Sequence, residues 1–247
     1  MLNIVVPMAG SGKKFLEKGY TFPKPLIEIK GKPMVEWVVK NLTPKVEHRF
    51  IFICNREHYE KFRLGSTLSL LAPNSKIIIL NAPTHGAACS VLLAKEYINN
   101  QDELVIANSD QYIDTSIDQF LTKAREEDAD GFIMTFRSTH PKYSFAKVSS
   151  SGLVLETAEK NPISDSATVG VYYYKTGESF VHAAESMIKK DIRTNNEFYV
   201  CPVYNQLILE DKKIKVYEIP SDKMYSWGTP EDLEYFLSTQ FYKEKFN

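Results

Sequence analysis

Hydrophobic residues in the first half of the chain fall into short runs that are separated by polar or glycine-bearing segments. Five runs rich in β-branched and aromatic residues predict buried strands: residues 2–6, 49–54, 76–80, 103–107 and 131–136. The segments between them carry helix-favouring patterns, and helices are expected over residues 33–42, 57–71, 86–98 and 116–127. Repeated alternation of strand and helix predicts an α/β protein, with a Rossmann-like, mostly parallel sheet covered by helices on both faces.

The second half of the chain has a different pattern. The segment around Ser150-Ser151-Gly152, over residues 145–158, predicts a hairpin. Further strands are expected over residues 167–174 and 214–219, and helices over residues 177–189, residues 203–209 and from Pro230 to the end. Because no linker-like segment divides the chain, we expect a single domain over residues 1–247, with halves of about residues 1–137 and 138–247.

The composition narrows the class of protein. With 247 residues, 43% of them hydrophobic, the chain can bury one large core. The formal net charge of −1 provides no overall field for nucleic acid or an anionic membrane, so neither is expected as a partner. The three cysteines lie far apart and form no C-x-x-C pair, which indicates a reduced cytoplasmic protein without a zinc site. We see no signal-peptide pattern and no apolar run of the ~20 residues that span a membrane.

A loop with two glycines and two lysines follows the first predicted strand. It reads Pro7-Met8-Ala9-Gly10-Ser11-Gly12-Lys13-Lys14, and Pro23-Lys24-Pro25-Leu26 comes shortly after it. Glycines let backbone N–H groups approach an anion closely, and lysines supply the opposite charge, so the stretch predicts a phosphate site. The alternative is a tight turn with solvated lysines.

Two better-known phosphate loops do not match this stretch. A Walker loop would need glycine in place of Pro7 and Ser or Thr in place of Lys14. A dinucleotide-binding loop would need glycine in place of Phe15.

Two other loops are expected on the same rim of the sheet. Ligands of parallel α/β sheets bind at the carboxyl ends of the strands, which brings the Gly10 loop, the Pro83–Gly86 loop and the Asn108–Gln111 turn together. Asp110 stands just past a buried strand. A carboxylate at such a position is often a helix N-cap.

Taken together, the motifs resemble the sugar-1-phosphate nucleotidyltransferase family over about the full length of the chain. The resemblance is carried by Met8-Ala9-Gly10-Ser11-Gly12, Phe22-Pro23-Lys24-Pro25-Leu26, Asn81–Ala88, Val105–Gln111, Thr157–Pro162, Thr168–Tyr172, Asn196–Tyr199 and Tyr225–Asp232. It implies the nucleotidyltransferase fold, a nucleoside triphosphate and a phosphorylated acceptor as substrates, Mg²⁺ as cofactor and release of pyrophosphate. The chain departs from the family at Lys13 and Lys14, where Thr or Ser and then Arg are usual, and at Ser226, where the usual Asp is the second metal ligand.

The resemblance also implies roles for individual residues. Lys14, Lys24 and Asp110 are expected to be catalytic, and Asp110 to hold Mg²⁺ with Asp222 or water as the second ligand. Nucleotide binding is expected from Met8, Ala9, Gly10, Ser11, Gly12, Lys14, Lys24, Asn81, Pro83, Gly86, Ala87 and Ser109. Acceptor binding is expected from Tyr143, Ser144, Glu159, Lys160, Gly170, Glu197 and Trp227, although Trp227 could equally pack in the core. The first half would then bind the nucleotide and the second half the acceptor.

Four motifs are more similar to a branch of the family that is found in bacterial capsule loci: Gly19–Leu26, Asn108–Gln111, Thr168–Tyr174 and Asn195–Val200. This branch implies a cytidylyltransferase with CTP as donor and phosphoglutamine as the small phosphorylated acceptor, in the synthesis of a capsule phosphoramidate. One alternative is a sugar-1-phosphate uridylyl-, thymidylyl- or guanylyltransferase that makes a nucleotide sugar. Another is a non-catalytic, nucleotide-binding regulatory subunit. The oligomeric state stays open, with a homo-oligomer among the options.

Overall fold

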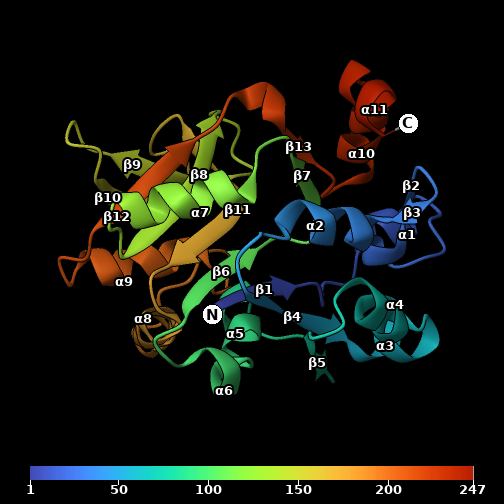
Figure 1. Ribbon diagram of the computed structural model, residues 1–247, viewed down its shortest axis with the longest axis horizontal. Helices are drawn as coiled ribbons and strands as arrows, with labels where there is room; N and C mark the ends of the chain where they lie inside the picture. The colour runs from blue at the N-terminus through green and yellow to red at the C-terminus, as the bar shows by residue number, and fades with distance from the viewer. Residues whose placement is uncertain (247) are drawn as a thin grey trace.

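A nine-stranded sheet forms the centre of the computed structural model, which describes residues 1–246 (Figure 1). The strand order is β10-β9-β11-β6-β1-β4-β5. β9 and β6 pair with different parts of the same edge of β11, β8 pairs with the opposite edge of β11, and β12 pairs with β8. These strands are β1 (Leu2–Pro7), β4 (His48–Asn55), β5 (Lys76–Leu80), β6 (Glu103–Ala107), β8 (Gly131–Arg137), β9 (Ser144–Val148), β10 (Val154–Glu159), β11 (Ser166–Tyr174) and β12 (Ile214–Glu218).

The sheet has a parallel part and an antiparallel part. β1 pairs in parallel with β4 and β6, and β5 extends the parallel part beside β4. β11 is antiparallel to β6, β8 and β9, and β10 is antiparallel to β9. Every strand of this sheet except β10 and β11 therefore runs in the direction of β1, which confirms the predicted mostly parallel sheet. The position of β11 between β6 and β8 joins the two halves of the chain in one sheet.

Helices cover both faces of the sheet. They are α1 (Lys13–Glu17), α2 (Met34–Leu42), α3 (Arg56–Lys61), α4 (Leu64–Leu71), α5 (Ala87–Leu92), α6 (Lys95–Ile98), α7 (Ile117–Glu126), α8 (Gly177–Lys189), α9 (Tyr204–Ile208), α10 (Pro230–Ser238) and α11 (Gln240–Lys245). Short 3-10 turns are η1 (Lys24–Leu26), η2 (Cys201–Val203) and η3 (Ser221–Lys223). None of the helices within residues 1–246 has the length and apolar character needed to cross a membrane.

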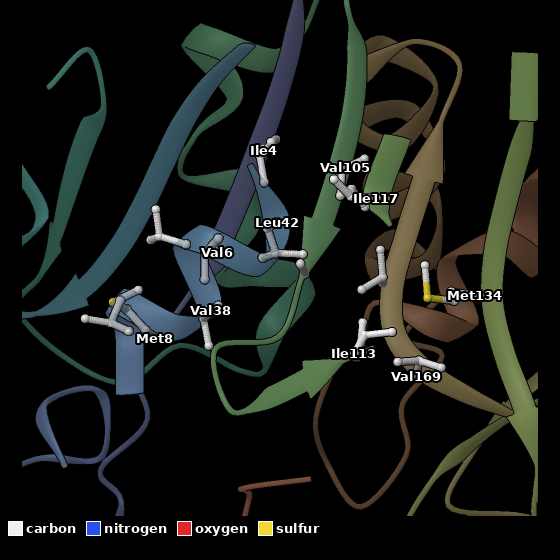
Figure 2. Close-up of a cluster of buried hydrophobic side chains, with 14 of the residues drawn as sticks. Ile4, Val6, Met8, Val38, Leu42, Val105, Ile113, Ile117, Met134 and Val169 are labelled. Atoms are coloured by element: carbon white, nitrogen blue, oxygen red, sulfur yellow. The ribbon is translucent and has the colours of Figure 1, made fainter. Parts of the chain in front are cut away.

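Two hydrophobic cores lie on the two faces. Side chains alternate along a strand, so Ile4 and Val6 of β1 enter one core while Val5 enters the other. Figure 2 shows the first core, where Ile4 and Val6 gather with Val38 and Leu42 of α2. Helices α4, α7 and α10 also contribute to this core, and α5, α6, α8 and α9 contribute to the second. The helical layers on both faces confirm the predicted α/β architecture.

The structure corrects three helix predictions. The predicted helix over residues 57–71 is interrupted at Arg63, whose φ of 55° is left-handed, and the helix over residues 86–98 is interrupted before Lys95. The predicted C-terminal helix is divided at Thr239, because its extended backbone ends α10 and its side chain caps α11. Asn247, at the end of that predicted helix and of the expected domain, lies outside the described residues.

Two small ladders were not predicted from the sequence. β2 (Glu28–Ile29) pairs with β3 (Lys32–Pro33), and β7 (Gln111–Ile113) pairs antiparallel with β13 (Met224–Ser226). Strands of two or three residues are too short for a periodic hydrophobic pattern. The second ladder has a functional consequence, because it brings the C-terminal part of the chain beside the Asn108–Asp110 turn.

Candidate active site

A cavity of about 540 Å³ opens at the carboxyl ends of the parallel strands. Among the residues predicted for the site, the cavity is lined by Met8, Ala9, Gly10, Ser11, Lys24, Pro83, Gly86, Ala87, Ser109, Asp110 and Glu197. It is also lined by residues that were not named individually: Pro7, Asn55, Leu80, Thr84, Ser90, Asn108 and Tyr199. Of these, Thr84, Asn108 and Tyr199 belong to stretches that the sequence had placed at the site or that carry the family resemblance. Asn55 and Leu80 are the last residues of β4 and β5, so the strand-end rule could have found them.

The glycine loop continues directly from β1 into the cavity wall. The Met8 N–H group donates a hydrogen bond of 2.9 Å to the carbonyl oxygen of Ile53, which anchors the start of the loop to β4. No atom lies within 4 Å of the point where a Cβ at residue 10 would stand, so the backbone of Gly10 is open to a ligand. Gly12 is left-handed, with a φ of 63°, and begins α1.

Lys24 and Asp110 face each other in the cavity. The Lys24 Nζ atom lies 2.6 Å from Asp110 Oδ2, and both side chains are about one-fifth exposed. Lys24 is held between Pro23 and Pro25 at the start of η1. Asp110 lies between β6 and β7, and its backbone carbonyl oxygen accepts a 2.7 Å hydrogen bond from the backbone N–H group of Trp227. Since Ser116 is the N-cap position of α7, the alternative of Asp110 as a helix cap is excluded.

A second loop is attached to the Pro83–Gly86 loop by backbone hydrogen bonds. The Phe198 N–H group donates to the carbonyl oxygen of His85 at 2.7 Å, and the Ala88 N–H group donates to that of Phe198 at 3.0 Å. Gly86 permits this approach, because its φ is 116° and a Cβ there would stand 2.5 Å from the Phe198 carbonyl oxygen.

The same loop contains a tight turn that presents Glu197 to the cavity. Asn195 and Asn196 have φ values of 49° and 63°, and Thr194 and Glu197 exchange backbone hydrogen bonds of 3.0 Å. Two central residues with positive φ are typical of a type I′ turn, for which Asn is favoured. The turn places Glu197 and Tyr199 in the cavity wall.

Lys160, which was predicted for acceptor binding, contacts the cavity wall through Tyr199. The Lys160 Nζ atom donates a 2.6 Å hydrogen bond to the Tyr199 hydroxyl oxygen, and burial together with the neighbouring Glu197 carboxylate raises the pKa of Tyr199. Beside Lys160, the buried Glu159 carboxylate accepts a hydrogen bond from the Ser144 hydroxyl. Burial raises the pKa of Glu159. Tyr199 therefore connects the cavity to a buried polar pair.

Several predicted residues lie outside the cavity wall. Gly12, Lys14 and Asn81 are not among the lining residues. Gly12 packs beside Lys24, Lys14 is exposed, and the Asn81 side chain accepts a hydrogen bond from Arg56. Gly170 has a φ of 88° and packs behind Asn108, because a Cβ at residue 170 would stand 2.2 Å from Asn108 Nδ2.

Tyr143 and Trp227 belong to the packing of the molecule. Tyr143 is half-buried and contacts Phe136 edge to face. Trp227 has no exposed surface and packs against Tyr112 and Phe236, which corrects the expectation that its side chain lines the acceptor site.

The β7–β13 ladder separates Asp222 from Asp110. Ser226 pairs with Gln111, the neighbour of Asp110, whereas Met224 pairs with Ile113. The antiparallel register therefore carries Asp222 beyond the far end of β7, away from Asp110. This corrects the expectation that Asp222 is the second ligand.

The donor set at Asp110 fits a magnesium ion that is shared with a substrate. Within residues 1–246, no group of three or more His, Cys, Asp or Glu side chains is arranged to hold a metal ion. Mg²⁺ commonly binds one or two carboxylates together with substrate phosphates. A single carboxylate in a cavity large enough for a nucleotide matches this pattern.

Known proteins with related sequences cover different parts of the chain. The chain is 22% identical over 243 residues to the bifunctional protein GlmU of Methanocaldococcus jannaschii, over 96% of this chain and 54% of that protein. It is 28% identical over 121 residues to GlmU of Methanococcus maripaludis strain C7, over 49% of this chain and 27% of that protein. The chain thus spans only part of the length of these curated relatives.

Solved structures match the chain over nearly its whole length. The nucleoside-diphosphate-sugar pyrophosphorylase from Vibrio cholerae RC9 has a TM-score of 0.82 at 27% identity, with 96% of this chain and 100% of that chain covered. The inositol-1-phosphate CTP transferase from T. maritima has a TM-score of 0.73 at 16% identity, with 98% and 95% covered, and this likeness concerns the fold alone. The sequence pattern of the nucleotidyl transferase family matches residues 4–233. The chain therefore belongs to the nucleotidyl transferase family.

Proposed function

We propose that this protein transfers a nucleoside monophosphate from a nucleoside triphosphate to a small phosphorylated acceptor and releases pyrophosphate. One observation carries the proposal. Lys24 and Asp110 come from segments 86 residues apart, yet they meet at 2.6 Å in the same cavity as the open backbone of Gly10. A cation, a carboxylate and accessible backbone N–H groups at the end of a parallel sheet suit a reaction between phosphate groups.

The proposed reaction needs no general base. A phosphate monoester is largely ionised near neutral pH, because its second pKa is about 6. An oxygen of the acceptor phosphate attacks the α-phosphorus and forms a new P–O bond. The bond from the α-phosphorus to the oxygen that bridges to the β-phosphate breaks, and pyrophosphate leaves with the electron pair. The protein must align two anions and offset the charge on the leaving group.

The cations of the site divide this task. We assign Lys24 to the α-phosphate and the attacking phosphate, since its ammonium group is in the cavity. Lys14 and the backbone N–H groups of Gly10–Gly12 are assigned to the β- and γ-phosphates. Lys14 is exposed and would act as a point charge rather than as a bidentate group. Mg²⁺ held by Asp110 and the phosphates would neutralise part of the charge at the reacting centre.

The acceptor is proposed to be phosphoglutamine and the nucleotide CTP. Lys160 could pair with the carboxylate of an amino-acid phosphate, and Glu197 or Glu159 with its ammonium group. The contact between Lys160 and Tyr199, which lines the cavity beside Glu197, supports this assignment. Base choice is assigned to the backbone of the Met8–Gly10 and Asn81–Ala88 loops.

A pyrophosphate-release assay tests the proposal. CTP, UTP, dTTP, ATP and GTP are each combined with phosphoglutamine and with several hexose 1-phosphates, and kcat/KM is compared. We expect the highest value for CTP with phosphoglutamine. A higher value for UTP or dTTP with glucose 1-phosphate would instead favour a nucleotide-sugar enzyme, the activity in the name of the Vibrio cholerae structure. If folded protein bound nucleotide and released no pyrophosphate with any pair, a non-catalytic regulatory subunit would be favoured.

A further inference from the structure

Two hydroxyl groups and a backbone carbonyl group form a hydrogen-bonded triangle in the cavity wall. Thr84 Oγ1 lies 3.0 Å from the carbonyl oxygen of Gly86 and 2.7 Å from Ser90 Oγ. Ser90 Oγ lies 3.4 Å from the same carbonyl oxygen, which also accepts a 3.1 Å hydrogen bond from the Ser90 backbone N–H group. Ser90 is buried, with 7% of its surface exposed, and both hydroxyl-bearing residues line the cavity. We call Thr84 and Ser90 the hydroxyl pair.

The triangle uses both protons of the hydroxyl pair. A hydroxyl group has one proton to donate and two lone pairs to accept with. If Ser90 donates to Thr84, then Thr84 donates to the Gly86 carbonyl oxygen, and if Thr84 donates to Ser90, then Ser90 donates to that carbonyl. In both arrangements each hydroxyl oxygen keeps at least one lone pair. The hydroxyl pair therefore presents two neighbouring hydrogen-bond acceptors to a ligand, and no donor.

The hydroxyl pair lies at a distance from the phosphate end of the cavity that suits a nucleobase. Asp110 follows β6 and Thr84 follows β5, and β1 and β4 lie between these two strands in the sheet. Adjacent strands are about 4.8 Å apart, so the ends of β6 and β5 are separated by roughly 14 Å. A nucleotide whose phosphates lie beside Lys24 thus has its base within reach of the hydroxyl pair. Apolar surface for the ring is provided there by Leu80, Pro83 and Ala87.

Two asparagines near the same end do not supply hydrogen-bond acceptors of this kind. The Asn55 Oδ1 atom accepts a 2.8 Å hydrogen bond from the Glu57 N–H group as the N-cap of α3, so its side chain leaves N–H donors for a ligand. The Asn81 side-chain oxygen is occupied by Arg56, and Asn81 is not among the lining residues. The hydroxyl pair supplies the acceptors that these two side chains do not.

We propose, building on the function above, that Thr84 and Ser90 recognise the exocyclic amino group of the nucleobase. The amino group of cytosine offers two N–H donors at the edge of the ring, which suits two neighbouring acceptors. Uracil and thymine carry a carbonyl oxygen at that position, and their ring N–H group stands between two carbonyl oxygens. A carbonyl oxygen that faces the hydroxyl pair finds no donor, and an unpaired polar group weakens binding. The hydroxyl pair therefore selects CTP over UTP and dTTP.

Equilibrium binding of nucleotides to the full chain tests the proposal. Isothermal titration calorimetry is carried out with Mg²⁺ and without a phosphorylated acceptor. CTP is compared with UTP and with the triphosphate of pyrimidin-2-one riboside, which is CTP without the amino group. Loss of the amino group should weaken binding about two- to tenfold, the equivalent of one hydrogen bond. UTP should bind about ten- to hundredfold more weakly than CTP, because its carbonyl oxygen is also left unpaired.

Two variants should shift the preference between the bases. Thr84→Val keeps the shape of the side chain and leaves the Ser90 proton with the Gly86 carbonyl oxygen at 3.4 Å, so that proton can turn toward a ligand. Binding of UTP relative to CTP should improve about two- to tenfold. Ser90→Ala removes one hydrogen-bond acceptor and should weaken CTP binding by a similar factor, with UTP binding at least as strong as before. Thr122→Val, at an exposed position of α7, is the matched control.

The outcomes separate this inference from the proposed function. Equal binding of CTP, UTP and the analogue without the amino group would overturn the inference, and this comparison needs no variant to fold. Thr84→Val and Ser90→Ala proteins that fold and weaken all three nucleotides by one factor would also overturn it, because hydroxyls that only hold the first turn of α5 do not distinguish bases. If the preference follows the amino group and no phosphorylated acceptor releases pyrophosphate from CTP, the proposed transfer is wrong and the inference stands. Absence of binding for all three nucleotides would overturn both.

Discussion

The nucleotide side of the cavity is made from the ends of adjacent strands, whereas the acceptor side reaches the cavity through a chain of side-chain contacts. Residues at or just after the ends of β1, β4, β5 and β6 line the first side, and the sheet backbone fixes their positions. On the second side, Glu197 depends on a two-residue turn and Lys160 depends on the Tyr199 hydroxyl. We therefore expect kcat to fall when a single charged side chain is removed from the nucleotide side. We expect KM for the acceptor to change when the loop that holds Glu197 or the contact of Tyr199 is altered.

Removal of the Lys24 ammonium group should have the largest effect. Lys24→Ala is expected to lower kcat by at least ~10²-fold, the usual scale for a preorganised charge at the reacting group. The melting temperature should change little, because a partly exposed ion pair contributes about 1 kcal/mol or less. Lys14→Ala removes an exposed lysine outside the cavity wall and is the matched comparison, which should act mainly on KM for the nucleotide. A folded Lys24→Ala protein with near-normal kcat would contradict the assignment.

Asp110→Asn should be the next most severe change. Since one carboxylate would be shared with Mg²⁺, activity at limiting Mg²⁺ should fall by about ten- to hundredfold and recover in part at high Mg²⁺. Activity as a function of Mg²⁺ concentration and thermal melting measure the two effects. Loss of folded protein with normal activity per folded molecule would show that Asp110 is only structural.

The sequence could predict the nucleotide side because its signals are local. Gly10, Lys24 and Asp110 each stand at the end of a recognisable strand or inside a short motif, and the strand-end rule then brings them together. The predicted element types were largely correct, because long buried strands such as β4 have clear hydrophobic patterns.

The remaining features depend on contacts that no local pattern encodes. In the register of the three-residue ladder β7–β13, Ser226 lies beside the neighbour of Asp110 and Asp222 lies beyond the far end of β7. Trp227 packs between Phe236 of the following helix α10 and Tyr112, and the contact with Tyr112 could not be predicted because that residue is distant in sequence. Tyr199 belongs to the Asn196–Tyr199 stretch of the resemblance, but its individual role could not be predicted because it depends on its contact with Lys160, 39 residues away.

A pair of glycine variants separates the two sides directly. Gly86→Ala places a Cβ 2.5 Å from the Phe198 carbonyl oxygen at a φ of 116°, and should cost about 1–3 kcal/mol of stability. It should raise KM for the acceptor by displacing the Glu197 turn, and also KM for the nucleotide, because Gly86 belongs to the Asn81–Ala88 loop that we assign to the base. A Cβ at residue 10 meets open space, so Gly10→Ala should have a normal melting temperature. The added methyl group should raise KM for the nucleotide, because it covers backbone that is open to a ligand. Equal effects of both variants on both substrates would show that the two sides are not separable.

Loss of the Tyr199 hydroxyl should have a smaller effect. Tyr199→Phe removes the partner of Lys160 and is expected to raise KM for the acceptor about two- to tenfold, the equivalent of one hydrogen bond. The nucleotide KM and the melting temperature should stay nearly constant. Steady-state kinetics with each substrate varied in turn measures the difference. If Tyr199→Phe changed only KM for the nucleotide, the assignment of Tyr199 to the acceptor side would be wrong.

The smallest expected effect is a pH dependence of stability that comes from Glu159. Burial raises the pKa of this carboxyl above its usual 4.5 in the folded protein, so folding favours its protonated form. The unfolded chain ionises first as the pH rises, and the folded state therefore loses stability between pH 4.5 and the raised pKa. Glu159→Gln keeps the shape of the side chain and removes the ionisation, so it should be more stabilising at pH 7 than near pH 4. The melting temperature of both proteins across this range measures the difference, and Glu156→Gln, an exposed residue on the same strand, is the matched control. A difference that does not change with pH would contradict the raised pKa of Glu159, and a difference that changes in the opposite direction would mean that folding stabilises Glu159 as a carboxylate.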